Sequence, residues 1–328
     1  MGFCFARYYK WQLRAGFECE TAPHSARRPR HITVCSLCVT YCRTYGVACC
    51  SIRASQDIHL KKNTMAQKTR ITFDDCCNEL LGRGATGGLQ ALDRWSCNPR
   101  LREVVPFVKG FAHEYLFTLG PDTVRDVISR STHALGNVES TEQLPVIENF
   151  TAPFALQHLF HWYVEEKQSL PTWRDFRNWM VLGPAEPLWL GVLKAYLGKP
   201  RDIEEARQWS RATRWRLGKF YLSAMREVDL LLRLRHAGIP VRYHLLGDVL
   251  LRTDLWINSL IVCLYFPNSA YRDGKDEGRK PPAEKFFAGA NPPFEIIHFP
   301  VERQGFGRVW LAKDESVEEL AQLIQTHL

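Results

Sequence analysis

Residues 247–266, GDVLLRTDLWINSLIVCLYF, decide how we interpret the fold. They contain two runs of strand-forming residues, DVLLRTDLWI and SLIVCLYF, which the turn signal Asn258-Ser259 separates. Asp254 stands inside the first run, where a carboxylate is costly to bury without a partner. The stretch predicts a hairpin and leaves two alternatives for Asp254: a metal ligand, or a half-exposed strand residue beside Arg252.

The flanking sequence extends this hairpin into a mixed domain. IPVRYHLL (239–246) precedes it as a predicted strand, and FEIIHFPVE (294–302) and GRVWLAK (307–313) follow as two more. A short helix is expected around 284–287, and Ser316 with Glu319 forms the capping box of a closing helix. The order is helix, three strands, short helix, two strands, helix.

Upstream, residues 70 to about 237 have the pattern of successive helices. Thr72 and Asp75 are suited to start the first, and Asp202 with Glu205 to start a long last one that runs to Gly238. The expected helical stretches between them are 101–120, 121–136, 152–168, 172–183 and 187–198. We therefore expect an α+β protein: a helical region, 65–199, then a long helix and an α/β domain, 200–328, with a mixed, largely antiparallel central sheet.

Charge and cysteine are concentrated at the start of the chain. Of 43 Lys/Arg and 35 Asp/Glu in 328 residues, segment 1–64 holds 10 and 3, so the remainder is nearly neutral. Cys35 and Cys38 have a metal-knuckle spacing that other Cys or His residues of the segment would have to complete as a zinc site. No second such pair follows, so we favour an extension outside the working protein, or a disordered basic tail.

The bulk sequence excludes several classes of protein. There is no run of about eighteen apolar residues and no apolar core of a signal peptide, so we expect no membrane partner. The few cysteines after residue 64 favour a reduced, cytoplasmic protein over a disulfide-built secreted one. Gly82, Gly84 and Gly87 match a dinucleotide-binding spacing, but a helical pattern precedes them, so a connector is expected there.

Two groups in the helical region have a functional alternative beside a structural one. His158, His161 and Glu165 lie on one helix face, where they could ligate a metal, although packed histidines are the default. The long helix carries a basic stripe that suits phosphate contact and base stacking, or else is a solvated face with ion pairs. The residues of this stripe are Arg207, Arg211, Arg214, Trp215 and Lys219.

From about residue 215 to 328 the order of elements resembles the restriction-endonuclease-like PD-(D/E)XK nucleases. In that family a helix leads into an antiparallel meander whose second strand carries a metal-binding aspartate. The third strand normally carries an acid and a lysine two residues apart. The resemblance implies that Asp254 binds Mg²⁺ and that Glu227, on the preceding helix, matches an acid that some members have there.

The third predicted strand departs from the family pattern, because LIVCLYF has neither the acid nor the lysine. The nearest replacements are Lys275, Lys280, Glu284 and Lys285, of which we take Glu284 and Lys285 as the catalytic candidates. Mg²⁺ at a phosphodiester needs carboxylates, and the lysine orients water and offsets negative charge.

Three functions follow from these patterns. The first is a nucleic-acid-associated protein, with DNA preferred over RNA, that carries a divergent nuclease-like domain, active or inactive. The second is a non-catalytic scaffold or binding module with a protein partner, as in a bacterial mobile-element or defence system, by analogy of fold. The third is a small-molecule enzyme that would use His113, Glu114, Tyr243 and His244.

Overall fold

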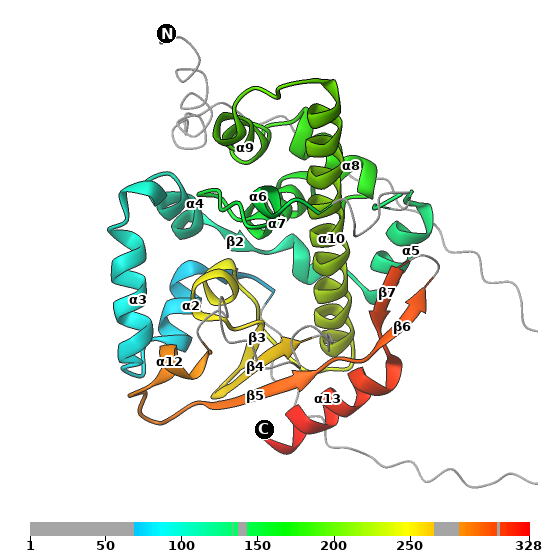
Figure 1. Ribbon diagram of the computed structural model, residues 1–328. Coiled ribbons are helices and arrows are strands. Elements are labelled where there is room, and N and C mark those ends of the chain that lie inside the picture. The colour runs from blue at the N-terminus through cyan, green and yellow to red at the C-terminus, as the bar shows by residue number, and fades with distance from the viewer. Residues whose placement is uncertain (1–68, 133, 137–142, 266–281, 307–308) are drawn as a thin grey trace, which may run out of the picture. The chain divides into compact units, whose positions relative to one another are not determined.

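The computed structural model describes residues 69–132, 134–136, 143–265, 282–306 and 309–328 (Figure 1). The segment 1–64, with Cys35 and Cys38, lies outside them, as do Lys275 and Lys280. The described residues form a mixed α+β structure. Residues 61–328 make up one compact unit.

Helix α2 (Phe73–Leu80) begins at the predicted capping box. The Thr72 hydroxyl accepts from the Asp75 N–H (3.1 Å), and the Asp75 carboxylate accepts from the Thr72 N–H (2.8 Å). Helix α3 (Thr86–Ser96) starts inside the glycine-rich stretch, which joins two helices and does not follow a long strand. Gly87 is required by close packing, because a Cβ there would lie 1.9 Å from the Lys285 carbonyl oxygen of α12 (Glu284–Phe287).

The helix predicted over 101–120 is wrong, because the chain is broken there into four short elements. They are η1 (Pro99–Leu101), α4 (Val104–Gly110), β2 (Ala112–His113) and η2 (Tyr115–Thr118). The physical reason is tertiary: β2 pairs antiparallel with β1 (Ile71–Thr72), so the backbone is extended after Gly110. Sequence pattern cannot foresee a pairing with a strand about forty residues away.

The remaining predicted stretches of this region do contain helices, namely α5 (Pro121–Arg130), α7 (Leu156–Lys167), α8 (Trp173–Val181) and α9 (Leu190–Leu197). The short helix α6 (Pro145–Glu148) was not predicted. The aromatic side chains of these helices pack as a core, with Phe176 stacked on Tyr221 at 5.8 Å between ring centroids.

Helix α10 (Ile203–His236) is the long predicted helix, and it contacts both the helices that precede it and a strand and a helix that follow it in the chain (Figure 1). The Asp202 carboxylate accepts from the Glu205 N–H (2.8 Å), as the sequence predicts for its start. From Ala212 onward, buried residues recur along the helix. It packs against α5, α6, α7 and α8, and also against β7 (Val309–Ala312) and α13 (Asp314–Thr326).

The central sheet has three strands, in the order β3 (Leu255–Ile257), β4 (Leu260–Tyr265) and β5 (Glu295–Pro300). β3 pairs antiparallel with β4, and β4 pairs parallel with β5, so the sheet is mixed as expected. β7 forms a separate hairpin with β6 (Arg303–Phe306). α12 lies between β4 and β5 in the chain, as predicted.

The strand predicted over 239–246 is wrong, because these residues contribute only a bridge between Arg242 and Trp256. The strand predicted over 248–257 is shortened to β3, because residues 247–251 form a π-helical turn, η4 (Gly247–Leu251). The closing helix begins at Asp314, so Ser316 lies inside its first turn and is not the predicted N-cap residue. Ser316 is buried, and its hydroxyl accepts from the Glu302 N–H (3.2 Å). These apolar runs are buried by tertiary contacts, and burial alone does not distinguish a strand from a turn or a helix.

Candidate functional site

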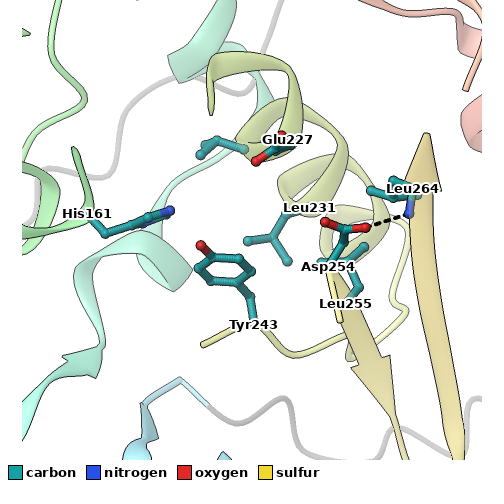
Figure 2. Close-up of a pocket in the computed structure, with 8 residues that line it drawn as sticks. His161, Glu227, Leu231, Tyr243, Asp254, Leu255 and Leu264 are labelled. Atoms are coloured by element: carbon teal, nitrogen blue, oxygen red, sulfur yellow. Dashed lines mark hydrogen bonds between the residues drawn. The ribbon is translucent and has the colours of Figure 1, made fainter. Parts of the chain in front are cut away.

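A small cavity lies beside α10, the start of β3 and the end of β4 (Figure 2). Its free volume of about 20 Å³ can hold a water molecule. We call it the acid cavity; its lining residues are His161, Glu227, Val228, Leu231, Tyr243, Asp254, Leu255 and Leu264. Glu227 and Asp254, which the family resemblance pairs in one site, are both among them.

Glu227 projects from the middle of α10 into this cavity (Figure 2). The pKa of Glu227 is raised to about 8, chiefly by burial and in addition by the nearby carboxylates of Asp248 and Asp254. The Tyr243 hydroxyl donates to the Asp248 carboxylate at 3.0 Å. The cavity lining thus contributes two carboxylates, and a third, that of Asp248, acts on Glu227 from nearby; the repulsion among them favours the protonated form of Glu227.

Asp254 does not stand inside a strand, as its pattern predicts, but in a bend directly before β3. Its carboxylate accepts from the Leu264 N–H at 2.6 Å, which continues the contact between the two strands beyond the Leu255–Val262 pair. Trp256, two residues further on, is fully buried, so it does not share an exposed strand face with Asp254. Asp254 thus has a structural role besides its place in the cavity.

Glu284 and Lys285 lie on α12, both exposed, and neither lines the acid cavity. The Glu284 carboxylate is 2.5 Å from His298 Nε2, and this hydrogen bond lowers the pKa of Glu284. The structure therefore brings Glu227 and Asp254 together but leaves the other two predicted catalytic residues out of the cavity lining.

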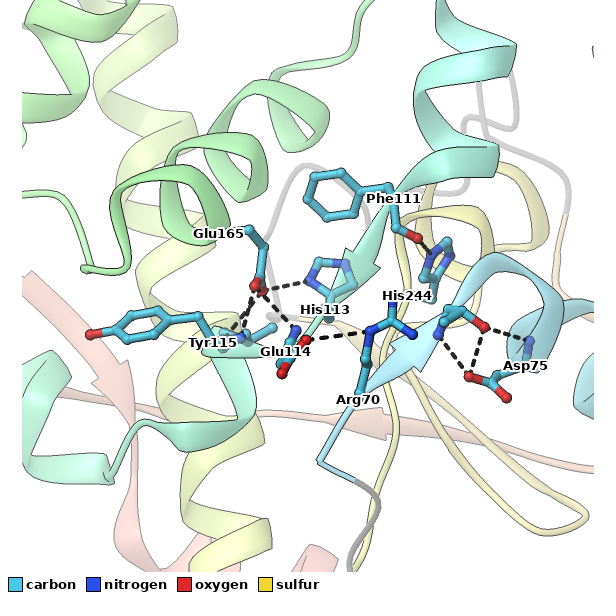
Figure 3. Close-up of polar contacts among 10 residues, drawn as sticks. Arg70, Asp75, Phe111, His113, Glu114, Tyr115, Glu165 and His244 are labelled. Atoms are coloured by element: carbon cyan, nitrogen blue, oxygen red, sulfur yellow. Dashed lines mark hydrogen bonds and ion pairs between the residues drawn. The ribbon is translucent and has the colours of Figure 1, made fainter. Parts of the chain in front are cut away.

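Four buried histidines form a cluster, two of which (His113 and His244) are labelled in Figure 3. From sequence alone, these four residues were assigned to two separate alternatives. They are His113, His158, His161 and His244. The ring centroid of His113 is 4.8 Å from that of His161 and 5.5 Å from that of His244. Burial lowers the pKa of His158 and of His244 to about 4, and lowers the pKa values of the other two well below the usual range. The cluster is therefore neutral at pH 7.

Two of the four histidines accept a hydrogen bond from a backbone N–H, whereas both ring nitrogens of His113 and Nδ1 of His161 are buried without a hydrogen-bond partner among the described residues. His158 Nδ1 accepts from the Ala155 N–H (3.1 Å), and His244 Nδ1 accepts from the Leu246 N–H (3.1 Å). Glu114, from the small-molecule alternative, is exposed and pairs with Arg70 at 3.3 Å. Within the residues that the structure describes, no three His, Cys, Asp or Glu side chains are grouped to hold a metal ion. The metal alternative for His158, His161 and Glu165 therefore has no ligand set in the described residues, and these histidines are packed in the core, which was the default expectation.

The basic stripe on α10 divides into an exposed and an inward-facing part. Arg207 is exposed and pairs with Glu204 at 3.5 Å, and Arg211 is also exposed. Arg214 Nε donates to the Ala134 carbonyl (3.4 Å), so this side chain faces the segment after α5. Lys219 pairs with Glu148 at 3.6 Å, and its ammonium lies 5.6 Å from the centroid of the half-buried Trp215 ring.

Comparisons with protein-family models, with curated proteins and with solved structures find no match to this chain. In the described part of the chain, no helix combines the length and the apolar character that crossing a membrane requires.

Proposed function

We propose that the chain is a nucleic-acid-associated protein with a divergent restriction-endonuclease-like domain, whose acid cavity is a Mg²⁺-dependent site for phosphodiester cleavage, with DNA preferred over RNA. One observation carries this proposal. Glu227 and Asp254 are separated by 26 residues in sequence, yet both line the same cavity (Figure 2).

The donor set of the acid cavity suits Mg²⁺. This ion prefers carboxylate oxygens, keeps several waters, and needs only one or two protein carboxylates beside the substrate phosphate. Glu227 and Asp254 would hold it, and Asp248 adds negative charge nearby. When bound, Mg²⁺ polarises a phosphoryl oxygen and lowers the pKa of bound water. The raised pKa of Glu227 supports this fit, because a cation would relieve the repulsion that causes part of it.

A second candidate function is a binding module that keeps the fold without catalysis. The observation in its favour is that the Asp254 carboxylate already accepts the Leu264 N–H, while β4 carries Cys263 and no lysine. In this alternative Asp254 is retained to fix the strands, and the cavity needs no metal.

Cleavage of DNA and RNA by the full chain with Mg²⁺ or Mn²⁺ tests the proposal. Asp254→Asn removes the charge but keeps an oxygen that can accept the Leu264 N–H, so the fold should persist. Glu227→Gln is the second variant, and Glu318→Gln, at an exposed position of α13, is the matched control.

We expect metal-dependent cleavage that Asp254→Asn and Glu227→Gln each slow by about 100-fold or more, since metal stabilisation of the transition state is worth several kcal/mol. The control should cleave like the wild type. Cleavage that is unchanged in Asp254→Asn would remove the acid cavity from the mechanism. A wild-type chain that cleaves no substrate would leave the binding module as the function.

A further inference from the structure

His161, on α7, lines the acid cavity together with the carboxylates of Glu227 and Asp254. Figure 2 shows its imidazole ring pointing from α7 towards Tyr243 and the interior of the cavity. The residue is only 6% exposed, so the part of the ring that lines the cavity faces this enclosed space. An imidazole therefore lies on the same cavity as the two carboxylates.

Packing fixes the orientation of this ring. Its centroid lies 4.8 Å from the ring centroids of both His113 and Tyr243, and 5.4 Å from that of Phe160. A ring enclosed by other rings in a close-packed core has little freedom to change its rotamer. His161 thus presents the same edge to the cavity without the cost of ordering a mobile side chain.

The two ring nitrogens of His161 have different surroundings. Nδ1 is enclosed by protein and has no hydrogen-bond partner among the described residues. Figure 2 shows a ring nitrogen at the tip of the side chain, on the side of the cavity. Since the covered nitrogen is Nδ1, the nitrogen that meets the cavity is Nε2.

A neutral imidazole nitrogen at a water-sized cavity can accept a proton from a water molecule. The ring of His161 is neutral at pH 7, because burial lowers its pKa. The free volume of about 20 Å³ suits one water molecule. Glu165, one turn further along α7, acts in the direction that raises the pKa of His161, so its carboxylate stabilises the ring once a proton is gained.

We propose that Nε2 of His161 is the general base of the acid cavity and accepts a proton from the water that attacks the phosphodiester. The lysine that would orient this water is missing from β4, and His161 takes over that task from α7. This inference rests on the proposed function, because it takes the acid cavity to be where the phosphodiester is cleaved.

The proton and the bonds of this step balance. The oxygen of the water forms a bond to phosphorus while one of its protons passes to Nε2 of His161. The bond between phosphorus and one ester oxygen breaks, and that oxygen takes up a proton from solvent. His161 then releases its proton to solvent and returns to the neutral state.

Two measurements on the full chain separate catalysis from binding: single-turnover cleavage of a DNA duplex with Mg²⁺, and anisotropy of the same labelled duplex in Ca²⁺. His161→Gln is the main variant, because its amide hydrogen-bonds water but does not take up a proton. His161→Phe keeps a ring for packing, should the first variant not fold. His158→Asn, a buried histidine of the same helix that does not line the cavity, is the matched control.

We expect His161→Gln to slow the single-turnover rate by about 100-fold, the size of effect that general-base catalysis supplies. The affinity for the duplex in Ca²⁺ should stay that of the wild type, because the base acts on water and does not hold the substrate. His158→Asn should keep both values.

A third measurement reads the tautomer of His161 without any cleavage. In a long-range ¹H–¹⁵N spectrum of the metal-free chain with ¹⁵N-labelled histidine, the signals that are lost in His161→Gln or His161→Phe belong to His161. We expect the proton on Nδ1 and a bare Nε2 at pH 7. A resting ring with its proton on Nε2 would overturn the proposal.

Failure of this inference differs from failure of the proposed function. Cleavage that Asp254→Asn slows but that a folded His161→Gln chain performs at the wild-type rate would overturn the role of His161 and leave the catalytic site intact. A loss of duplex affinity in His161→Gln as large as the loss of rate would also overturn it, since it would show a role in binding. A wild-type chain that cleaves no substrate would end both proposals.

Discussion

Glu165, for which helical spacing suggested a role as a metal ligand, binds backbone N–H groups in the structure (Figure 3). Its carboxylate accepts from three consecutive backbone N–H groups, those of Glu114 (3.1 Å), Tyr115 (2.8 Å) and Leu116 (3.2 Å), where η2 begins. It also lies 3.5 Å from His113 Nδ1. Since the first N–H groups of a helical turn have no partner within it, this carboxylate satisfies them from α7.

Glu165→Ala should therefore lower the free energy of unfolding by about 3 kcal/mol, because it leaves these N–H groups without their charged acceptor. Urea denaturation of the full chain measures this change. Glu166→Ala, at the exposed neighbouring position, is the control and should change stability by less than about 0.5 kcal/mol. Equal effects of the two substitutions would contradict the role of Glu165.

At the scale of elements, α10 holds the short helix α6 in place through Arg216. The guanidinium donates to the carbonyls of Ile147 and Phe150, at the end of α6, and its centre lies 5.3 Å from the ring centroid of Trp189. A four-residue helix is unstable by itself, so its position depends on such contacts. At least one basic residue of α10, Arg216, therefore serves to hold a neighbouring helix in position.

Arg216→Met keeps much of the apolar contact but removes the donors, so two carbonyls lose their charged partner. We expect a loss of about 2 kcal/mol in the free energy of unfolding. Arg207→Met, on the exposed part of the same helix, should cost less than about 0.5 kcal/mol, because its pair with Glu204 is exposed. Chemical denaturation of both variants compares them directly. A larger loss for Arg207→Met than for Arg216→Met would contradict the structural role of Arg216.

At the scale of the whole molecule, the buried histidines make stability depend on pH. Each has a lower pKa in the folded state than the value of about 6.5 in the unfolded chain, so the unfolded chain binds protons first as pH falls. Stability is therefore complete above about pH 6.5 and is lost towards pH 4. The groups that face the cluster are Glu165, Tyr243 and Asp75.

Two buried acids act in the opposite direction. The pKa of Asp229 is raised to about 6 and that of Glu227 to about 8, chiefly by burial, so the folded state binds protons at these two sites as pH falls. With about 1.4 kcal/mol per pH unit for each group, four histidines outweigh two acids. We expect the free energy of unfolding to decrease by about 3 kcal/mol from pH 7 to pH 5.

Urea denaturation between pH 7 and pH 5 measures this decrease. His158→Asn should reduce the slope of stability against pH by about 1.4 kcal/mol per pH unit, because it removes one titrating group while its amide oxygen can accept the Ala155 N–H. A stability that is flat or rises towards pH 5 would show that protonation of these histidines is not what limits it.

The sequence by itself determined the elements whose signals are local. Thr72 with Asp75 and Asp202 with Glu205 begin helices as predicted, because a cap depends on residues three positions apart. β4 and β5 also form where predicted, and β4, the middle strand of the sheet, begins with the buried apolar run Leu260–Val262. The pairing of Glu227 with Asp254 was an expectation from the order of elements, not from any motif.

Only the tertiary structure decided the rest, because the contacts involved are distant in sequence. The turn that replaces the predicted strand before β3 is fixed by bonds from Cys263 and Leu264, and these give Arg252 its left-handed backbone conformation. Helical spacing placed His158, His161 and Glu165 on one face, but it could not reveal that this face meets His113 and His244. Sequence periodicity predicts which residues are buried, but it does not predict which other residues they contact.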